Sequence, residues 1–229
     1  MANFGFSRLA VVAPYEPHWR EAKSAVGADH LLQSAHCTQT LSDAIADCTL
    51  VLGTGTVTTR KPEQPVVPLP LLAPFIQNEG KNGRIALVFG PEKRGLTRED
   101  LSLCHHLVEI PTHPRQPSMN LAQAVAVCLY ELATPRVKST SPGNPTTLPD
   151  PLPASTASPA AASDLELLAD VIEQTMTAVN YSPPAMRSAN RHDLHLLLRR
   201  LSLTQNDAKR ILGLFRRILW RLRHRVGPD

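Results

Sequence analysis

Two short apolar runs, each followed by a loop rich in Gly, Pro and polar residues, constrain this fold more than any other feature of the chain. They fall within residues 84–131. Residues 85–89 are few enough for a buried strand, and residues 107–110 form a second run of this kind. The second loop leads into an apolar helix that we expect over residues 121–132. Since α/β proteins hold ligands at the carboxyl ends of parallel strands, we expect a ligand site where the two loops meet.

The first loop carries signals for a tight turn followed by a short helix. Gly90 ends the first run, Gly95 follows a charged turn, and Thr97 with Asp100 three residues later matches a capping box. Both glycines have an ordinary reading as turn residues. We favour a functional one for Gly90 and Gly95, in which the backbone approaches a cofactor too closely for any side chain.

The second loop ends with polar residues directly before the 121–132 helix. Ser118 and Asn120 are residue types that commonly cap helices. A helix N-terminus also offers N–H groups to an anion, so capping and binding of a phosphate are compatible roles. Glu92, in the first loop, is either a solvated turn carboxylate or a residue that shapes the site.

The remaining pattern predicts an α/β fold with a parallel sheet. Further apolar runs at 9–13 and 50–52 read as strands, and helical segments at 18–33 and 71–78 lie between strands. Residues 60–74 are rich in proline and are expected to form an extended loop.

The chain divides into three parts by composition. Residues 1–134 hold the α/β pattern, and residues 135–163 contain seven prolines among Ser, Thr and Ala, which predicts a linker. Residues 164–229 predict a small all-α domain with helices from residue 164, over residues 192–201, and from Thr204.

Positive charge is concentrated at the end of the chain. The net charge is +4, yet residues 187–225 contain eleven Lys/Arg and two Asp/Glu. A solvated helix face and a membrane-surface helix are possible readings of this segment. We prefer binding of an anionic polymer, with Arg210, Arg216 and Arg217 as contacts to its charged groups.

The spacing of the cysteines and histidines does not predict a metal site. The four cysteines show no C-x-x-C pairing, which favours free thiols in a reducing cytoplasm. Cys104, His105, His106 and His113 lack the paired spacing of zinc ligands. No apolar run approaches membrane-spanning length and no secretory signal is visible, so we expect a cytoplasmic protein without membrane contact.

The two loops together resemble motifs of the SPOUT (SpoU) class of RNA 2′-O-methyltransferases, in particular its TrmJ-like branch. FGPEKRGLT is similar to the second motif of that family, and IPTHPRQPSMNLAQAV is similar to the third, with Met119 in place of the usual leucine. The resemblance implies a C-terminal trefoil knot in the α/β domain, S-adenosyl-L-methionine as cofactor and a homodimer. It also implies RNA as partner, with methylation of a tRNA cytidine or uridine in the anticodon loop.

The resemblance also assigns site residues. Ser118, Asn120 and Glu92 would serve catalysis. The cofactor would be held by Thr54, Gly55, Thr56, Gly90, Ile110, Pro117, Ser118 and Met119.

The family's first motif, Asn-x-Gly-x-x-x-Arg on a first strand and helix, is missing from this sequence. Its arginine is thought to activate the ribose hydroxyl, and Arg8 is not a substitute because it lies beyond the first turn. A start codon at an internal methionine, a truncated gene and a shortened inactive protein are the alternatives. We therefore keep a second hypothesis, a non-catalytic RNA- or cofactor-binding remnant, and expect an exposed apolar sheet edge with weak stability or activity.

Overall fold

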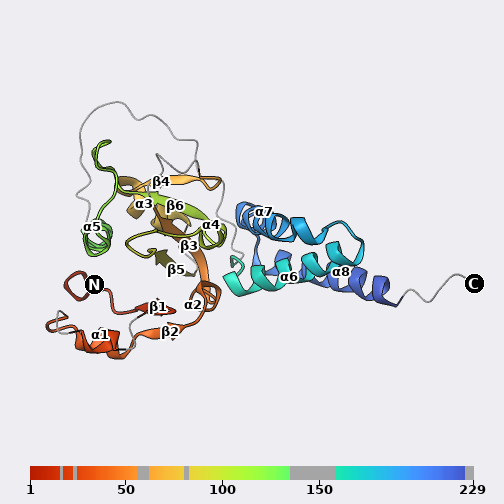
Figure 1. The fold of residues 1–229 in the computed structure, drawn as a ribbon, viewed down its shortest axis with the longest axis horizontal. Coiled ribbons are helices and arrows are strands. Elements are labelled where there is room, and N and C mark those ends of the chain that lie inside the picture. Colours follow the sequence, from red (N-terminus) through yellow and green to blue (C-terminus); the bar gives the residue numbers. More distant parts are fainter. Residues whose placement is uncertain (16–17, 23–24, 56–61, 80–82, 135–157, 225–229) are drawn as a thin grey trace, which may run out of the picture.

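The computed structural model describes residues 1–15, 18–22, 25–55, 62–79, 83–134 and 158–224. The α/β part and a group of three long helices lie at opposite ends of the molecule (Figure 1). The 135–157 portion of the predicted linker lies outside the described residues.

A four-stranded parallel sheet forms the centre of the α/β part. Its order is β4-β6-β3-β5, from strands β3 (Cys48–Thr54), β4 (Val66–Pro68), β5 (Arg84–Val88) and β6 (His106–Glu109). The predicted strands at 50–52, 85–89 and 107–110 are confirmed, whereas β4 lies where we expected an extended loop. Proline is tolerated in β4 because this strand is at an edge of the sheet.

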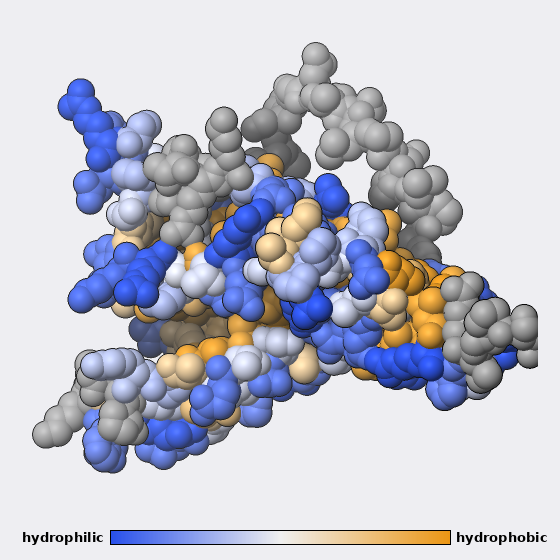
Figure 2. Space-filling view, turned by 45° about the vertical axis from the view of Figure 1, so that its right-hand side comes forward, coloured by the Kyte–Doolittle hydropathy of each residue, from blue (hydrophilic) through white to orange (hydrophobic). Residues whose placement is uncertain are grey.

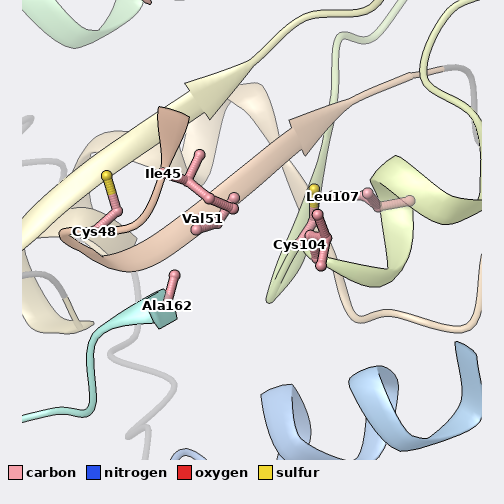
Figure 3. Packing of buried hydrophobic residues seen from close by; sticks show 7 residues of the cluster. Ile45, Cys48, Val51, Cys104, Leu107 and Ala162 are labelled. Atoms are coloured by element: carbon pink, nitrogen blue, oxygen red, sulfur yellow. The ribbon is translucent and has the colours of Figure 1, made fainter. Parts of the chain in front are cut away.

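Apolar side chains cover both faces of this sheet. On one face, Leu52 and Val108 pack with Leu72 of helix α3 (Leu69–Glu79) and Cys128 of helix α5 (Leu121–Ala133). On the other face, a cluster joins helix α2 (Leu41–Ala44), the sheet and the first residue of helix α6 (Figure 3). Its buried members are Ile45, Cys48, Val51, Leu103, Cys104, Leu107 and Ala162.

The prediction that strand 9–13 belongs to the same sheet is wrong. Strand β1 (Ala10–Val12) pairs with β2 (His36–Thr38) in a separate two-stranded parallel sheet. Among the described strands, β5 pairs with β3 alone, and its residues 85–88 are only half-buried although they are apolar. Figure 2 shows a hollow with hydrophobic surface between the lower arm, which carries β1 and β2, and the rest of the molecule. The expected exposed sheet edge is therefore present.

The predicted helix over 18–33 is also wrong in its middle. A short 3-10 helix η2 (Trp19–Glu21) and helix α1 (Asp29–Gln33) occupy its ends. Gly27 between them has a φ of +71°, which a continuous right-handed helix does not permit. A further 3-10 turn, η1 (Ala2–Phe4), begins the chain.

The three helices expected after residue 164 are present. They are α6 (Ala162–Ala178), α7 (Arg187–Arg200), preceded by the 3-10 turn η3 (Pro184–Met186), and α8 (Gln205–Arg223). Leu168, Leu194 and Leu198 form their shared core. No helix within the described ranges is long and apolar enough to cross a membrane.

Polar contacts connect these helices to the α/β part. The Ser163 N–H donates to the Ala46 carbonyl at 3.0 Å, and His195 on α7 lies 3.3 Å from the Ser102 hydroxyl on α4 (Arg98–Ser102). Beside them the buried Arg199 forms an ion pair with Glu166 at 2.9 Å. The helices are thus held against the sheet by specific contacts.

Candidate functional site

A cavity of about 240 Å³ lies at the carboxyl ends of β3, β5 and β6. Three chain segments enclose it, namely the end of β3, the loop after β5, and the loop from β6 into α5. The lining residues are Thr54, Gly55, Phe89, Gly90, Pro91, Glu92, Lys93, Arg94, Gly95, Leu96, Ile110, Thr112, Pro117, Ser118, Met119, Leu121 and Ala124. The parallel strands deliver these loops to one edge, as expected for a ligand site of an α/β sheet.

Most of the predicted site residues are brought together here. Thr54, Gly55, Gly90, Glu92, Ile110, Pro117, Ser118 and Met119 all line the cavity. Thr56 lies outside the described residues. Sequence reasoning missed Phe89, Leu96, Thr112, Leu121 and Ala124. These are mostly apolar residues whose pattern also suits a core, so only the folded loops identify them.

Asn120 does not line the cavity but joins two of its walls. Its Oδ1 accepts the N–H of Ala122 at 2.9 Å and so caps α5. Its Nδ2 donates to Oε1 of Glu92 in the loop after β5. The predicted cap is confirmed, and the same side chain fixes the relative position of the two loops.

Hydrogen bonds to backbone carbonyls hold the other walls. The Thr54 hydroxyl donates to the carbonyl of Val88 at 3.0 Å, which ties the end of β3 to the end of β5. The Thr112 hydroxyl donates to the carbonyl of Pro117 at 3.3 Å, across the loop before α5. The cavity walls are therefore fixed by the chain itself.

Glycine is required at position 90 for a different reason from the one we expected. A Cβ at this position would lie 2.2 Å from the Gly95 carbonyl carbon and 2.2 Å from the Leu96 nitrogen. The close approach is thus between two backbone segments of the same turn, which Gly95 closes with a φ of +64°. Glycine is required to shape the cavity wall, before any ligand is considered.

Comparisons with known proteins agree with this geometry. Residues 1–130 match the model of the SpoU rRNA Methylase family. A Pectobacterium atrosepticum protein named tRNA (cytidine/uridine-2'-O-)-methyltransferase TrmJ is 30% identical over 206 residues, covering 87% of this chain and 80% of that protein. This chain belongs to the SpoU methylase family.

Two further relatives of this SpoU-family chain show how the likeness is distributed. A Pseudomonas aeruginosa tRNA (cytidine/uridine/adenosine-2'-O-)-methyltransferase TrmJ is 40% identical over 139 residues, which span 58% of this chain and 52% of that protein. The crystal structure of TrmJ from Z. mobilis ZM4 superposes with a TM-score of 0.79 at 27% identity, covering 95% of this chain and 89% of that one. The likeness in structure thus includes the helical region.

Arg8 does not line the cavity in this SpoU-family fold. Its charge acts on the Cys48 thiol, where it opposes the burial that raises the pKa of that group. Cys48 begins β3 and Thr54 ends it, and six residues of extended strand span about 20 Å. That Arg8 is no substitute for the motif arginine stays a prediction.

Arg210, Arg216 and Arg217 are likewise absent from the cavity lining. They are exposed on α8, in the helical group at the other end of the molecule (Figure 1). The structure therefore separates the cavity from this basic surface.

The buried cysteine and histidine side chains near β6 have structural roles. Burial lowers the pKa of His105 to about 3, and the neutral ring accepts the Val51 N–H at 3.1 Å. Burial raises the pKa of the Cys104 thiol to about 12, which leaves it unreactive. Possible metal ligands converge elsewhere among the described residues, at Glu63, His192 and Asp193. There the Arg98 guanidinium already donates to Glu63 and His192.

Proposed function

We propose that this chain is an S-adenosyl-L-methionine-dependent RNA 2′-O-methyltransferase that acts on tRNA, with a pyrimidine of the anticodon loop as target. The observation that carries the proposal is the convergence of Thr54, Gly90, Glu92 and Ser118 on one cavity. Relatives that share most of the chain's length and are named tRNA (cytidine/uridine-2'-O-)-methyltransferase support it.

The cavity lining suits the proposed cofactor. Ile110, Met119 and Leu121 offer apolar surface for an adenine ring, and Thr54 and Ser118 offer hydroxyl oxygens for a ribose or an amino acid. Such a mixture of apolar walls with a few polar groups is typical of cofactor sites. When bound, S-adenosylmethionine supplies an electrophilic methyl group.

The chain's own residues would place the RNA. Ser118 and Asn120 lie at the N-terminus of α5, where the positive end of the helix dipole favours a phosphate. Lys93 and Arg94 add positive charge on the opposite wall. The contact between Asn120 and Glu92 fixes the two walls relative to each other, so residues on both walls would orient the bound RNA toward the cofactor.

The proposal includes the assembly and topology that the resemblance implied. Helix α5 exposes Val127 and Tyr130 on one side, and exposed apolar residues of this kind suit a homodimer interface. We also propose that residues 107–132 form the trefoil knot. The chain would then divide into a methyltransferase domain (1–134), a linker and a helical domain (164–229). We propose a cytoplasmic location, where tRNA is found. Sedimentation velocity should give a dimer, and Val127→Glu should shift it to a monomer without loss of folding.

Methyl transfer to tRNA tests the main proposal. The protein is incubated with unmodified tRNA and labelled cofactor, and nuclease digestion with mass spectrometry locates any methylated ribose. We expect one pyrimidine to be methylated at its 2′-oxygen and Ser118→Ala to reduce the rate. Ser163→Ala, a matched serine outside the cavity, should leave the rate unchanged. Methylation of a base would contradict the proposal.

A second candidate is a binding protein without transferase activity. The edge position of β5 among the described strands favours it. It predicts binding of S-adenosylhomocysteine and tRNA but no methyl transfer by the 1–229 protein, so one set of assays separates the two.

A further inference from the structure

We propose that Trp220 on α8 stacks against an unpaired base of the RNA, so that α8 binds the bases of single-stranded RNA as well as its phosphates. The inference rests on the proposed function only in taking RNA as the partner. It adds a base-stacking site outside the residues that line the cavity.

Helix α8 has one face for the core and an opposite face that is basic. Ala208 and Leu219 are buried, and Ile211, Leu212, Phe215 and Leu222 are partly buried on the same side. Residues seven apart lie almost above each other on a helix, so the basic residues form two adjacent exposed rows. One row is Lys209, Arg216 and Arg223, and the other is Arg210, Arg217 and Arg221.

Trp220 lies between these two rows. Its side chain is 48% exposed and takes no part in the helical core. The Arg217 guanidinium lies 5.1 Å from the centre of the ring and that of Arg221 lies 5.9 Å away. The His224 ring stacks on it at 4.8 Å with an interplanar angle of 21°. Flat cationic and aromatic groups are thus assembled around an exposed indole.

This arrangement has the two parts that single-stranded RNA requires. A row of cations binds the phosphates, and an aromatic ring stacks with a base of any sequence. Helix α8 carries six basic residues and Asp207 as its acidic one, so the face attracts a polyanionic partner. Both guanidinium and imidazole planes also stack on bases, so a base can join the existing column.

The position of this surface indicates which part of the RNA it contacts. Trp220 is near the end of α8, and that end lies on the side of the helical group away from the sheet (Figure 1). The base it stacks therefore belongs to a region distant from the nucleotide in the cavity. A folded RNA with unpaired bases in more than one place satisfies both sites.

An anionic membrane is the competing partner. Leu214 and Ile218 are exposed beside the arginines, and Figure 2 shows hydrophobic and strongly hydrophilic surface side by side on the helical part. Lipid binding would bury this apolar strip together with Trp220. We favour RNA because charged rows flank the indole on both sides, and the experiment includes vesicles.

Tryptophan fluorescence provides the test. Trp19 and Trp220 are the tryptophans of the chain, so the full-length Trp19→Phe protein reports on Trp220 alone. Titration with single-stranded RNA, without cofactor, should quench the emission. Trp220→Ala should weaken that binding about tenfold while leaving the salt dependence unchanged, because stacking involves no released counterions. Trp220→Phe should retain most of the affinity.

The controls separate stacking from charge and folding. Tyr181→Ala removes an aromatic that is 69% exposed outside α8 and should leave RNA affinity unchanged. Blunt duplex RNA should bind the wild type and Trp220→Ala equally. The proposal is overturned by unquenched emission on saturation with RNA, by equal losses for duplex and single strand, or by vesicles of anionic lipid competing for Trp220. A failed methyl-transfer assay would leave these readouts intact, so the two proposals fail separately.

Discussion

Replacing Gly90 with alanine should damage the cavity through the backbone of its own wall. The added Cβ would lie 2.2 Å from two backbone atoms of Gly95 and Leu96, whereas real Cβ contacts essentially never fall below 3.0 Å. Overpacking of this kind costs about 1–3 kcal/mol. Since the turn must open to admit the methyl group, we expect the free energy of unfolding to fall by about 2 kcal/mol. The affinity for S-adenosylhomocysteine should drop at least about tenfold, which corresponds to about 1.4 kcal/mol.

Urea denaturation followed by circular dichroism measures the first effect, and calorimetric titration measures the second. Gly55→Ala is the matched control for stability, because its Cβ would meet nothing within 4 Å. A Gly90→Ala protein as stable as the wild type would refute the steric argument. Equal destabilisation by both variants would refute it as well.

Three further experiments test other parts of the account. Leu72→Ala should lower the free energy of unfolding by about 2–5 kcal/mol because Leu72 is 0% exposed, while Leu71→Ala, at a position 56% exposed, should cost less than about 0.5 kcal/mol in the same denaturation experiment. The pKa of His105 is about 3 in the fold against 6.5 ordinarily. Between pH 3 and pH 6.5 the unfolded chain therefore binds one more proton than the folded chain. As the pH falls through this range, this group should lower the free energy of unfolding by up to about 1.4 kcal/mol per pH unit. His105→Gln should reduce the slope of stability against pH, and an unchanged slope would contradict the role assigned to His105. Asn120→Ala and Thr97→Ala each remove a helix cap worth about 1 kcal/mol; Asn120→Ala should also slow methyl transfer, and equal rates for the two variants would exclude the positioning role.

Local patterns predicted the site better than they predicted the sheet. The capping residues Thr97, Asn120 and Thr204 act where the sequence placed them, because capping depends on neighbours within three residues. The loops after β5 and β6 converge because parallel strands end at a common edge. These consequences follow from local chemistry and strand direction.

The errors came from features that depend on distant pairing. A strand at 10–12 is readable from its apolar residues, but its neighbour is set by which other edges are available, and β2 is that neighbour. The requirement at Gly90 depends on the backbone of residues 95–96, which only the folded turn places against it. The apolar lining of the cavity, such as Leu96 and Leu121, has the same pattern as a core.

Calorimetric titration of S-adenosylhomocysteine into the purified 1–229 protein tests the central claim most directly. The three loops already converge on one cavity with its walls tied by Asn120 and Thr54, so we predict saturable binding, one molecule per chain, with a dissociation constant in the micromolar range. Absence of binding by a protein that is folded by circular dichroism would contradict the assignment of this cavity to the cofactor.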